Sequence, residues 1–246
     1  MTEPAKIVKE TKVLAVRTLT GPQQREYREI RIGYPGFSFH PGQFVMVKKD
    51  LGPSCWAYPY MIQAACEDGF IVYAVKGTSL FDAYAELPLI VWGPSGKAVS
   101  TDDSTVVVVE PAAAFLATPF LNQDPNCRFI ALVDREKAGI LSGYANGSYV
   151  ESVEQAGALL HDLNAAKVIG ARNVENVQAL AAAGVPTQSI MAFASTKISC
   201  GVDGCKSCYL HSPDLPLGLS VCCNGPYLPY DKIDFEANVR CFHTFE

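Results

Sequence analysis

The sequence has no long apolar run, no excess of positive charge and no hydrophobic stretch among its first six residues. Its longest apolar runs, such as Val106–Val109 and Ile130–Val133, are far shorter than the roughly 20 residues that cross a bilayer, so no membrane span is expected. Twenty basic residues against 25 acidic ones give a net charge of −5 and no electrostatic reason to expect nucleic acid as a partner. Because Met1–Lys6 lacks the basic segment that opens a secretory signal, we expect a cytoplasmic protein.

The sequence also lacks any group of residues typical of acid–base or nucleophilic catalysis. Its four histidines are scattered: His40, His161, His211 and His243. We therefore predict no catalytic residues. With 246 residues, 49% of them apolar, the chain can still bury one large core or two smaller ones.

Residues 7–100 carry the pattern of antiparallel strands. Ile7–Thr18 and Tyr27–Ile32 alternate apolar and polar side chains, and glycine–proline turns separate the segments. Further strands are expected at Phe44–Val47, Phe70–Val75 and Leu89–Trp92. This series of short strands predicts a β-barrel.

The pattern changes after Gly93–Gly96. Continuous apolar runs, typical of parallel strands buried on both faces, occupy Val106–Val109, Phe129–Val133 and Ala166–Gly170. Helix-permissive stretches follow them at Ala112–Leu121, Val153–Leu163 and Asn173–Ala183. We predict an α+β multi-domain chain: a barrel at residues 1–100, an α/β nucleotide-binding-like domain at 101–194 and a cysteine-rich lobe at 195–246.

Six of the nine cysteines fall in the last 47 residues. Cys200, Cys205 and Cys208 are spaced C-x4-C-x2-C, and the adjacent Cys222 and Cys223 follow. This is the ligand spacing of a plant-type [2Fe–2S] cluster, since a four-residue loop can wrap the cluster with its N–H groups towards the sulfurs. Gly201 and Gly204 suit the close backbone approach of such a loop.

Two other interpretations of these cysteines stay open. Structural zinc usually uses paired C-x2-C knuckles, of which the chain has one, and free structural thiols are the third alternative. Cys222 and Cys223 compete for the fourth position, because adjacent side chains of an extended segment point to opposite faces. The remaining cysteines are expected to be bystanders: Cys55, Cys66, Cys127 and Cys241.

The segments Ser199–Cys208 and Val221–Pro226 resemble the iron–sulfur segment of the electron-transfer (PyrK-type) subunit of class 1B dihydroorotate dehydrogenase. Three shorter motifs resemble the ferredoxin-reductase superfamily to which that subunit belongs: His40–Val45, Lys76–Ser79 and Gly93–Gly96. In the family, the last cluster ligand is the Cys of a C-x-x-G-P motif. The resemblance therefore assigns the cluster to Cys200, Cys205, Cys208 and Cys222.

The resemblance implies an electron relay in pyrimidine biosynthesis. Reduced nicotinamide gives a hydride to FAD, and electrons then pass through the cluster to a catalytic subunit that holds FMN. A flavin suits this task because it accepts two electrons and releases them singly. A hetero-oligomeric oxidoreductase complex is thus expected, with this chain as its non-catalytic electron-transfer subunit.

The flavin motif of the family departs from its usual form in this chain. Where the family has Arg-Pro-x-Ser, the sequence has Tyr58, Pro59, Tyr60 and Met61, so the cation that neutralises the FAD pyrophosphate is missing. The two tyrosines can stack on a flavin or be ordinary barrel aromatics. The resemblance assigns the second flavin-side turn to Lys76, Gly77, Thr78 and Ser79.

The nicotinamide motif departs further. The family's glycine-rich loop after the first α/β strand is replaced by Val109–Phe115, in which Pro111 removes an N–H donor and Glu110 adds negative charge. The family's Cys-Gly-Pro motif is replaced by Gly170–Asn173. We therefore expect no ordinary NAD(P) binding and an electron donor other than free NAD(P)H. The alternatives are a docking subunit that keeps only the cluster and an independent NAD(P)H oxidoreductase.

Overall fold

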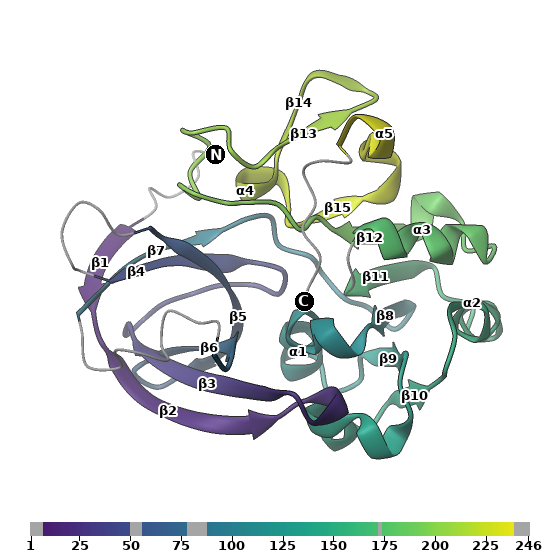
Figure 1. The fold of residues 1–246 in the computed structure, drawn as a ribbon, viewed down its shortest axis with the longest axis horizontal. Coiled ribbons are helices and arrows are strands. Elements are labelled where there is room, and N and C mark those ends of the chain that lie inside the picture. Colours follow the sequence, from purple (N-terminus) through teal and green to yellow (C-terminus); the bar gives the residue numbers. More distant parts are fainter. Residues whose placement is uncertain (1–6, 50–55, 78–87, 172–173, 239–246) are drawn as a thin grey trace.

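Two β-sheets lie side by side, and the C-terminal segment packs across one end of both (Figure 1). The structure is a computed structural model that describes residues 7–49, 56–77, 88–171 and 174–238. Within these residues, the expected antiparallel barrel-like sheet and the second, α/β sheet are confirmed.

The first sheet has seven strands, every neighbouring pair of them antiparallel. It curves into a barrel-like wall whose edge strands are β1 and β2 (Figure 1). In spatial order the strands are β1 (Ile7–Thr11), β7 (Leu89–Ser95), β4 (Phe44–Lys49), β5 (Tyr58–Cys66), β6 (Gly69–Val75), β3 (Glu26–Gly33) and β2 (Val13–Thr20).

Two details of this sheet differ from the sequence prediction. The segment Ile7–Thr18 forms two strands at opposite edges of the sheet, because the chain breaks at Lys12, whose carbonyl accepts from the Gly33 N–H at 3.1 Å. Strand β5 was not predicted. Exposed and buried residues do not alternate along β5, because the strand contributes to the barrel core and also contacts helix α1 (Ala114–Gln123).

The second sheet has six strands, five of them parallel. In spatial order they are β10 (Gly147–Tyr149), β9 (Arg128–Ala131), β8 (Thr105–Val109), β11 (Lys167–Ala171), β12 (Ile190–Phe193) and the antiparallel β15 (Tyr227–Pro229). Every residue of β8 is buried, as its unbroken apolar run predicts. The helices that pack on this sheet are α1, α2 (Val153–Asp162) and α3 (Val174–Ala182).

The strand order reverses between β8 and β11. After β8 the chain moves to β9 on one side, and it later returns to place β11 on the other side. Ligands of open α/β sheets bind outside the carboxyl ends of the strands at such a point. Helix α1, which starts there, also faces the barrel, so this end of the sheet borders the first sheet.

The C-terminal segment is held in the main core. It contains β13 (Tyr209–Ser212), β14 (Leu215–Ser220), α4 (Val221–Asn224), β15 and α5 (Phe235–Asn238). Cys208 and Cys222 belong to the same apolar cluster as Phe44 of the barrel and Val107 of the second sheet. The domain boundaries at residues 100 and 194 stay a prediction.

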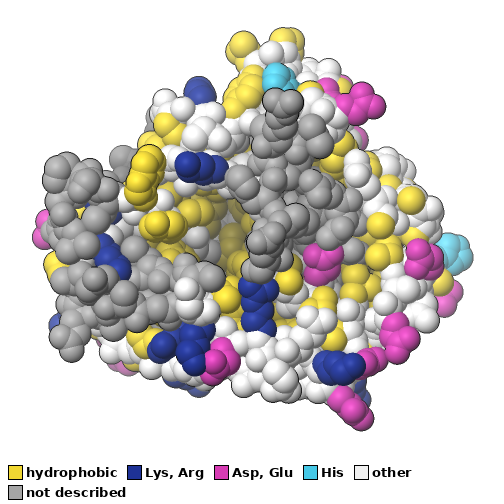
Figure 2. All heavy atoms as spheres, viewed as in Figure 1, with side chains coloured by type: hydrophobic (Ala, Val, Ile, Leu, Met, Phe, Trp, Pro, Cys, Tyr) yellow, Lys and Arg dark blue, Asp and Glu magenta, His cyan; other side chains and the backbone are white. Residues whose placement is uncertain are grey.

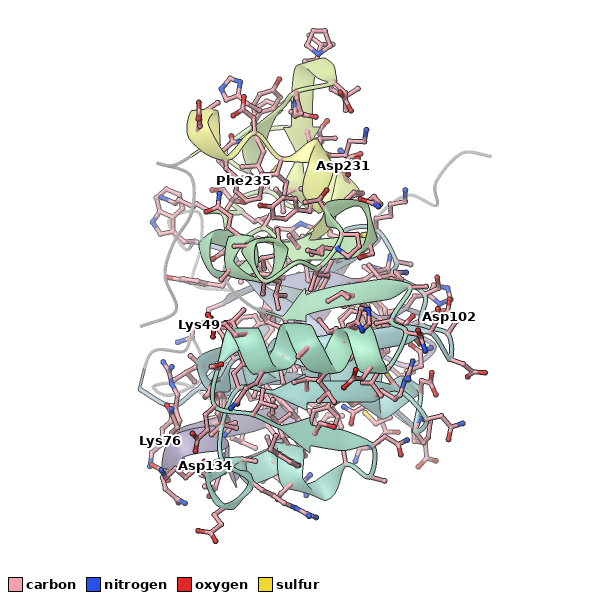
Figure 3. The ribbon with its side chains drawn as sticks, turned by 90° about the vertical axis from the view of Figure 1, so that its right-hand side faces the viewer. Lys49, Lys76, Asp102, Asp134, Asp231 and Phe235 are labelled. Carbon is pink, nitrogen blue, oxygen red and sulfur yellow. The ribbon has the colours of Figure 1, made fainter. Side chains whose placement is uncertain are left out.

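In a side view, Asp231 and Phe235 mark the C-terminal segment at one end of the molecule, and Lys76 and Asp134 lie towards the other end (Figure 3). Hydrophobic side chains are visible in the middle of one face, between the two sheets (Figure 2). Within the described part of the chain, no helix combines the length and the hydropathy needed to cross a membrane.

Candidate functional site

The four cysteines that the sequence assigns to a cluster lie together. Backbone hydrogen bonds join them in two pairs: Cys222 N–H donates to the Cys208 sulfur, and Cys205 N–H donates to the Cys200 sulfur. Cys208 is also close enough to Cys200 and Cys205 for their charges to affect it. Asp203 N–H also donates to the Cys222 sulfur, so the Cys200–Cys208 loop and Cys222 lie side by side; the potential ligand atoms that lie within 4.8 Å of one another among the described residues are those of Asp203, Cys222 and Cys223.

Backbone N–H groups point at these sulfurs, as the cluster interpretation predicts. The Cys200 sulfur accepts from the N–H groups of Val202 (3.4 Å) and Cys205 (3.5 Å). The Cys222 sulfur accepts from Asp203 N–H at 3.2 Å, and Cys222 N–H donates to Cys208 at 3.4 Å. Such hydrogen bonds stabilise charged sulfur and tune the reduction potential of a cluster.

The loop is fixed to the barrel strand β7. The indole N–H of Trp92 donates to the Cys200 carbonyl at 2.8 Å, and the buried Ser95 hydroxyl donates to the Gly201 carbonyl at 2.9 Å. Gly201 has φ +69°, a left-handed conformation that favours glycine. Gly204 lies in open space without a positive φ, so only Gly201 shows the close approach expected of both.

The surroundings shift the pKa values of these thiols in different directions. Hydrogen bonds with Ser207, whose hydroxyl lies 3.1 Å from the Cys205 sulfur, lower the pKa of Cys205 to about 7. The hydrogen bond with Cys222 lowers the pKa of Cys208 to about 7, and the same bond, together with burial, raises the pKa of Cys222. Thiolate is the form that binds metal, so the lowered pKa values favour metal binding at Cys205 and Cys208, and four thiols are the kind of donors that a [2Fe–2S] cluster takes.

The two candidates for the fourth ligand differ in their surroundings. Cys222 is fully buried against Cys208, whereas Cys223 is half-buried, with its sulfur 4.0 Å from that of Cys222. These contacts favour Cys222. Cys127 lies apart in the core, where burial raises its pKa to about 12. Cys66 is also outside the group, and two cysteines lie outside the described residues: Cys55 and Cys241.

Asp203 is a member of this site that sequence analysis missed. One of its carboxylate oxygens lies within 4.8 Å of the sulfurs of Cys222 and Cys223. The carboxylate pairs with Lys206 at 2.8 Å and accepts a hydrogen bond from the Ser220 hydroxyl. Its position depends on a left-handed backbone (φ +63°), which Asp tolerates better than most residues.

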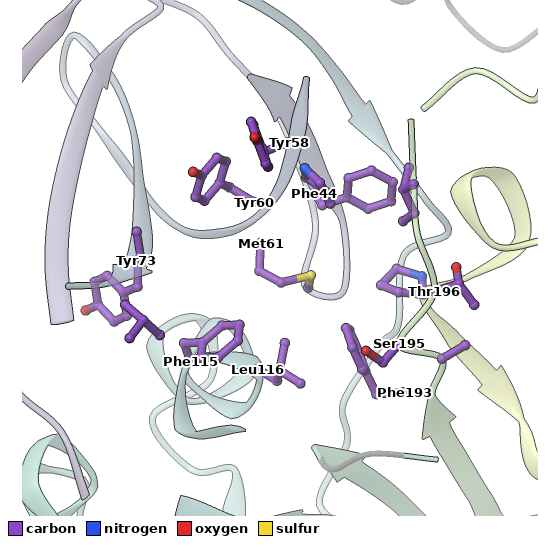
Figure 4. Close-up of a pocket in the computed structure, with 16 residues that line it drawn as sticks. Phe44, Tyr58, Tyr60, Met61, Tyr73, Phe115, Leu116, Phe193, Ser195 and Thr196 are labelled. Atoms are coloured by element: carbon purple, nitrogen blue, oxygen red, sulfur yellow. The ribbon is translucent and has the colours of Figure 1, made fainter. Parts of the chain in front are cut away.

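A cavity of about 280 Å³ opens between the barrel, the start of helix α1 and the segment after β12 (Figure 4). The predicted flavin residues Tyr58–Met61 line its barrel side. Phe115 of helix α1 and Phe193 of β12 border it from the second sheet. The cavity thus lies at the carboxyl end of β12 and beside the start of α1, which follows β8, one of the two strands between which the order reverses.

The second group of predicted flavin residues lies beside this cavity. Val75, the last residue of β6, lines it, and the exposed Lys76 and Gly77 follow. Lys76 forms an ion pair with Glu26 at 2.6 Å, and Gly77 has φ +86°. The other two members, Thr78 and Ser79, lie outside the described residues.

One residue of the cavity wall, Thr196, carries an unpaired polar atom that sequence analysis did not single out. The Thr196 hydroxyl oxygen is buried and has no hydrogen-bond partner among the described residues, although Thr196 lines the cavity. Because this oxygen is sealed from solvent, it does not face the open space of the cavity. The wall that a ligand would meet is mostly aromatic and apolar, and a planar ring system such as that of a flavin fits it.

The segment after β8, where the resembled family has its glycine-rich loop, folds tightly. A 3-10 turn over Pro111–Ala113 leads into helix α1, and the Ala113 N–H donates to the Glu110 carbonyl at 3.0 Å. Ala113 and Ala114 are buried, and the helix start has no side-chain cap. A dinucleotide phosphate would meet apolar methyl groups here instead of glycine N–H donors.

The cysteine loop begins next to the cavity. Ile198, which lines the cavity, precedes Cys200 by two residues, and two residues of chain span at most about 7 Å. Pro226 lines the cavity as well and follows Cys222 by four residues. Both ends of the thiol group are therefore tied to the cavity wall.

Comparisons with known proteins identify the fold. A scan against protein-family models and a search of curated proteins find no match. A chain of the NADH-dependent reduced ferredoxin–NADP oxidoreductase, a structure concerned with flavin-based electron bifurcation, matches with a TM-score of 0.65 and 14% identity, covering 98% of this chain and 93% of that one. The chain has a ferredoxin-reductase fold.

Two further structures agree. The ferredoxin reductase of carbazole 1,9a-dioxygenase, in its FAD apo form, matches at 21% identity and a TM-score of 0.57, covering 77% of this chain and 68% of that one. A mutant ferredoxin–NADP⁺ reductase from Plasmodium falciparum, with 2'P-AMP, matches at 10% identity and a TM-score of 0.56, covering 74% and 94%. At such identities the likeness establishes the fold and leaves the chemistry to the residues.

Proposed function

We propose that this chain is the electron-transfer subunit of a flavin-dependent oxidoreductase complex. The observation that carries the proposal is that backbone hydrogen bonds to sulfur bring the loop with Cys200, Cys205 and Cys208 against Cys222 of α4, beside the aromatic cavity. A flavin in the cavity, FAD in the first instance, would exchange electron pairs, and a [2Fe–2S] cluster on the loop would carry single electrons.

The chain's own residues supply positioning. Trp92 and Ser95 fix the loop carbonyls, and the backbone N–H groups of Val202 and Asp203 stabilise charge on the sulfurs. Burial of Cys208 and Cys222 keeps water from half of the thiol group. The reducing cytoplasm would keep the thiols available for iron.

The partner in this proposal is a catalytic flavoprotein subunit, of the FMN-containing dihydroorotate dehydrogenase type or of another oxidoreductase. The resemblance of Ser199–Cys208 and Val221–Pro226 to the family's iron–sulfur segment supports the first choice. The proposed electron donor is other than free NAD(P)H, because the Glu110–Ala114 loop lacks the donors that a dinucleotide phosphate needs.

Anaerobic purification of the full chain tests the cluster. We expect about two iron atoms and two sulfides per chain, with a visible absorption that bleaches on reduction. Cys208→Ser should abolish this absorption, and Cys127→Ser, which changes a buried cysteine apart from the group, should keep it. Comparing Cys222→Ser with Cys223→Ser identifies the fourth ligand. Colourless protein that contains only zinc would contradict the proposal.

A docking subunit with inactive nucleotide sites is the second candidate. The observation that favours it is the β13–β14 hairpin, which exposes Leu215 (43%) and Leu217 (85%) next to the cysteine loop. Flavin released on denaturation separates the two candidates: one flavin per chain supports the relay, and none supports docking. Rapid bleaching of the flavin by NADH or NADPH would instead support an independent oxidoreductase.

A further inference from the structure

Three side chains with metal-binding atoms meet where the cysteine loop contacts helix α4. Asp203 of the loop and the adjacent Cys222 and Cys223 of α4 each offer one ligand atom, and these three atoms lie within 4.8 Å of one another. Cys223 is not among the four ligands of the proposed cluster. Two thiols and one carboxylate are donors that a zinc ion accepts.

The separation of the two sulfurs fits a single ion. The sulfur of Cys222 lies 4.0 Å from that of Cys223. Two thiolates that bind one tetrahedral zinc ion at about 2.3 Å lie about 3.8 Å apart. A small movement therefore brings both sulfurs to one ion.

The surroundings of Asp203 hold its carboxylate in place and balance the charge. The carboxylate accepts a hydrogen bond from the Ser220 hydroxyl and pairs with the Lys206 ammonium at 2.8 Å. A carboxylate has about four acceptor positions, so these two contacts leave room for a metal. Two thiolates, the carboxylate, a divalent ion and the ammonium together carry no net charge, which lowers the cost of holding the ion in the protein.

The group is open to solvent on one side. Cys222 is fully buried, whereas Cys223 is half-buried and the Asp203 side chain is 40% exposed. An ion can reach these atoms from solvent and keep a water molecule as its fourth ligand, as zinc does in sites with three protein ligands.

We propose that Asp203, Cys222 and Cys223 form a zinc site that is distinct from the four-cysteine site of the cluster. Zinc binds the two thiols as thiolates, so their protons pass to the solvent. The zinc site goes beyond the proposed function, and one consequence rests on that function. Because both sites need Cys222, a zinc ion and a [2Fe–2S] cluster exclude each other, and zinc stops electron transfer through this chain.

Titration of the full, metal-free chain with Zn²⁺ against a coloured zinc chelator tests the site. We expect one zinc ion per chain. Cys223→Ser should weaken zinc binding more than about 100-fold, because loss of a ligand exceeds the roughly 10- to 100-fold effect of losing an outer hydrogen-bond partner. Asp203→Asn, which keeps the shape of the side chain, should weaken it about 10- to 100-fold and keeps the test valid if Cys223→Ser folds poorly.

Cys200→Ser is the matched control. It changes a cysteine of the cluster set that is not in the zinc group, so its zinc affinity should equal that of the wild type. Unchanged zinc affinity in both Cys223→Ser and Asp203→Asn would overturn the zinc site. Loss of zinc binding in Cys200→Ser would overturn it as well, because the ion would then lie among the four cluster cysteines.

Anaerobic reconstitution with iron and sulfide, with and without an equimolar amount of zinc, tests the exclusion. Zinc should prevent the visible absorption of the cluster in the wild type and should not prevent it in Cys223→Ser. Cluster assembly in wild-type protein that retains its zinc would overturn the exclusion. Failure of the zinc-free wild type to take up iron would overturn the proposed cluster and leave the zinc site standing.

Discussion

Replacing Gly201 by Ala should destabilise the metal-free protein by about 2–5 kcal/mol. The left-handed backbone (φ +69°) costs a residue with a Cβ about 1–2 kcal/mol. A Cβ at this position would also lie 2.5 Å from Met46 Cγ and 3.2 Å from its sulfur. Met46 is fully buried in β4, so relieving this overlap costs about 1–3 kcal/mol more.

The matched control is Gly36→Ala. Gly36 has a similar backbone conformation (φ +74°), but a Cβ there would meet nothing within 4 Å. Gly36→Ala should lower the free energy of unfolding only by the cost of the left-handed backbone, about 1–2 kcal/mol. The difference between the two variants therefore isolates the packing of the cysteine loop against the barrel.

Urea unfolding of both variants under reducing conditions gives the two free energies of unfolding. The double variant Gly201→Ala, Met46→Ala should be less destabilised than the sum of its single variants, because the second change removes the atoms that the new methyl group meets. Equal destabilisation by Gly201→Ala and Gly36→Ala would refute the reasoning. Iron content measured on the same proteins should fall in Gly201→Ala only, since only that change moves the loop.

Three further predictions follow from individual contacts. Asp203→Asn should move the midpoint potential of the proposed cluster to more positive values, because it removes a negative charge within 4.8 Å of the Cys222 sulfur. A redox titration measures the shift, and Asp102→Asn is the control. Gln63→Ala should cost about 2–4 kcal/mol in urea unfolding, since the buried amide of Gln63 joins the barrel to helix α1 and its loss leaves unpaired polar groups there. Hydrogen bonds, first those from Ser104, lower the pKa of Asp102. Its contribution to stability is therefore present above about pH 4 and is lost as the pH falls below that value. In Asp102→Ala, the urea concentration at half-unfolding should fall less steeply as the pH is lowered below about 4.

The parts of the fold that follow from local pattern were predictable from the sequence. The buried run Val106–Val109 became β8 because a strand covered on both faces needs apolar residues at every position. The cysteine spacing gave a loop with its N–H groups towards the sulfurs, because four residues between two thiols limit the backbone to a tight path.

Other parts depend on contacts that no local pattern records. Strand β5 packs on both the barrel core and helix α1, so buried and exposed side chains do not alternate along it. Pro59, within the strand, is a residue that normally argues against a strand. The cavity joins Tyr60, Phe115 and Thr196, which are far apart in the sequence and meet only through the arrangement of the two sheets. The orphaned hydroxyl of Thr196 can be recognised only once its surroundings are known.

The cysteine loop and the cavity wall form one hydrogen-bonded unit. Gly96 N–H donates to the Cys222 carbonyl at 2.9 Å, and Ala194 N–H donates to the Pro226 carbonyl at 2.8 Å. These bonds tie the segment that holds the fourth predicted ligand to the barrel on one side and to the end of β12 on the other. Because the same backbone carries both sites, the separation between a bound ring and the sulfurs is set by the fold. A change in the β7–α4 contact should therefore alter both sites together.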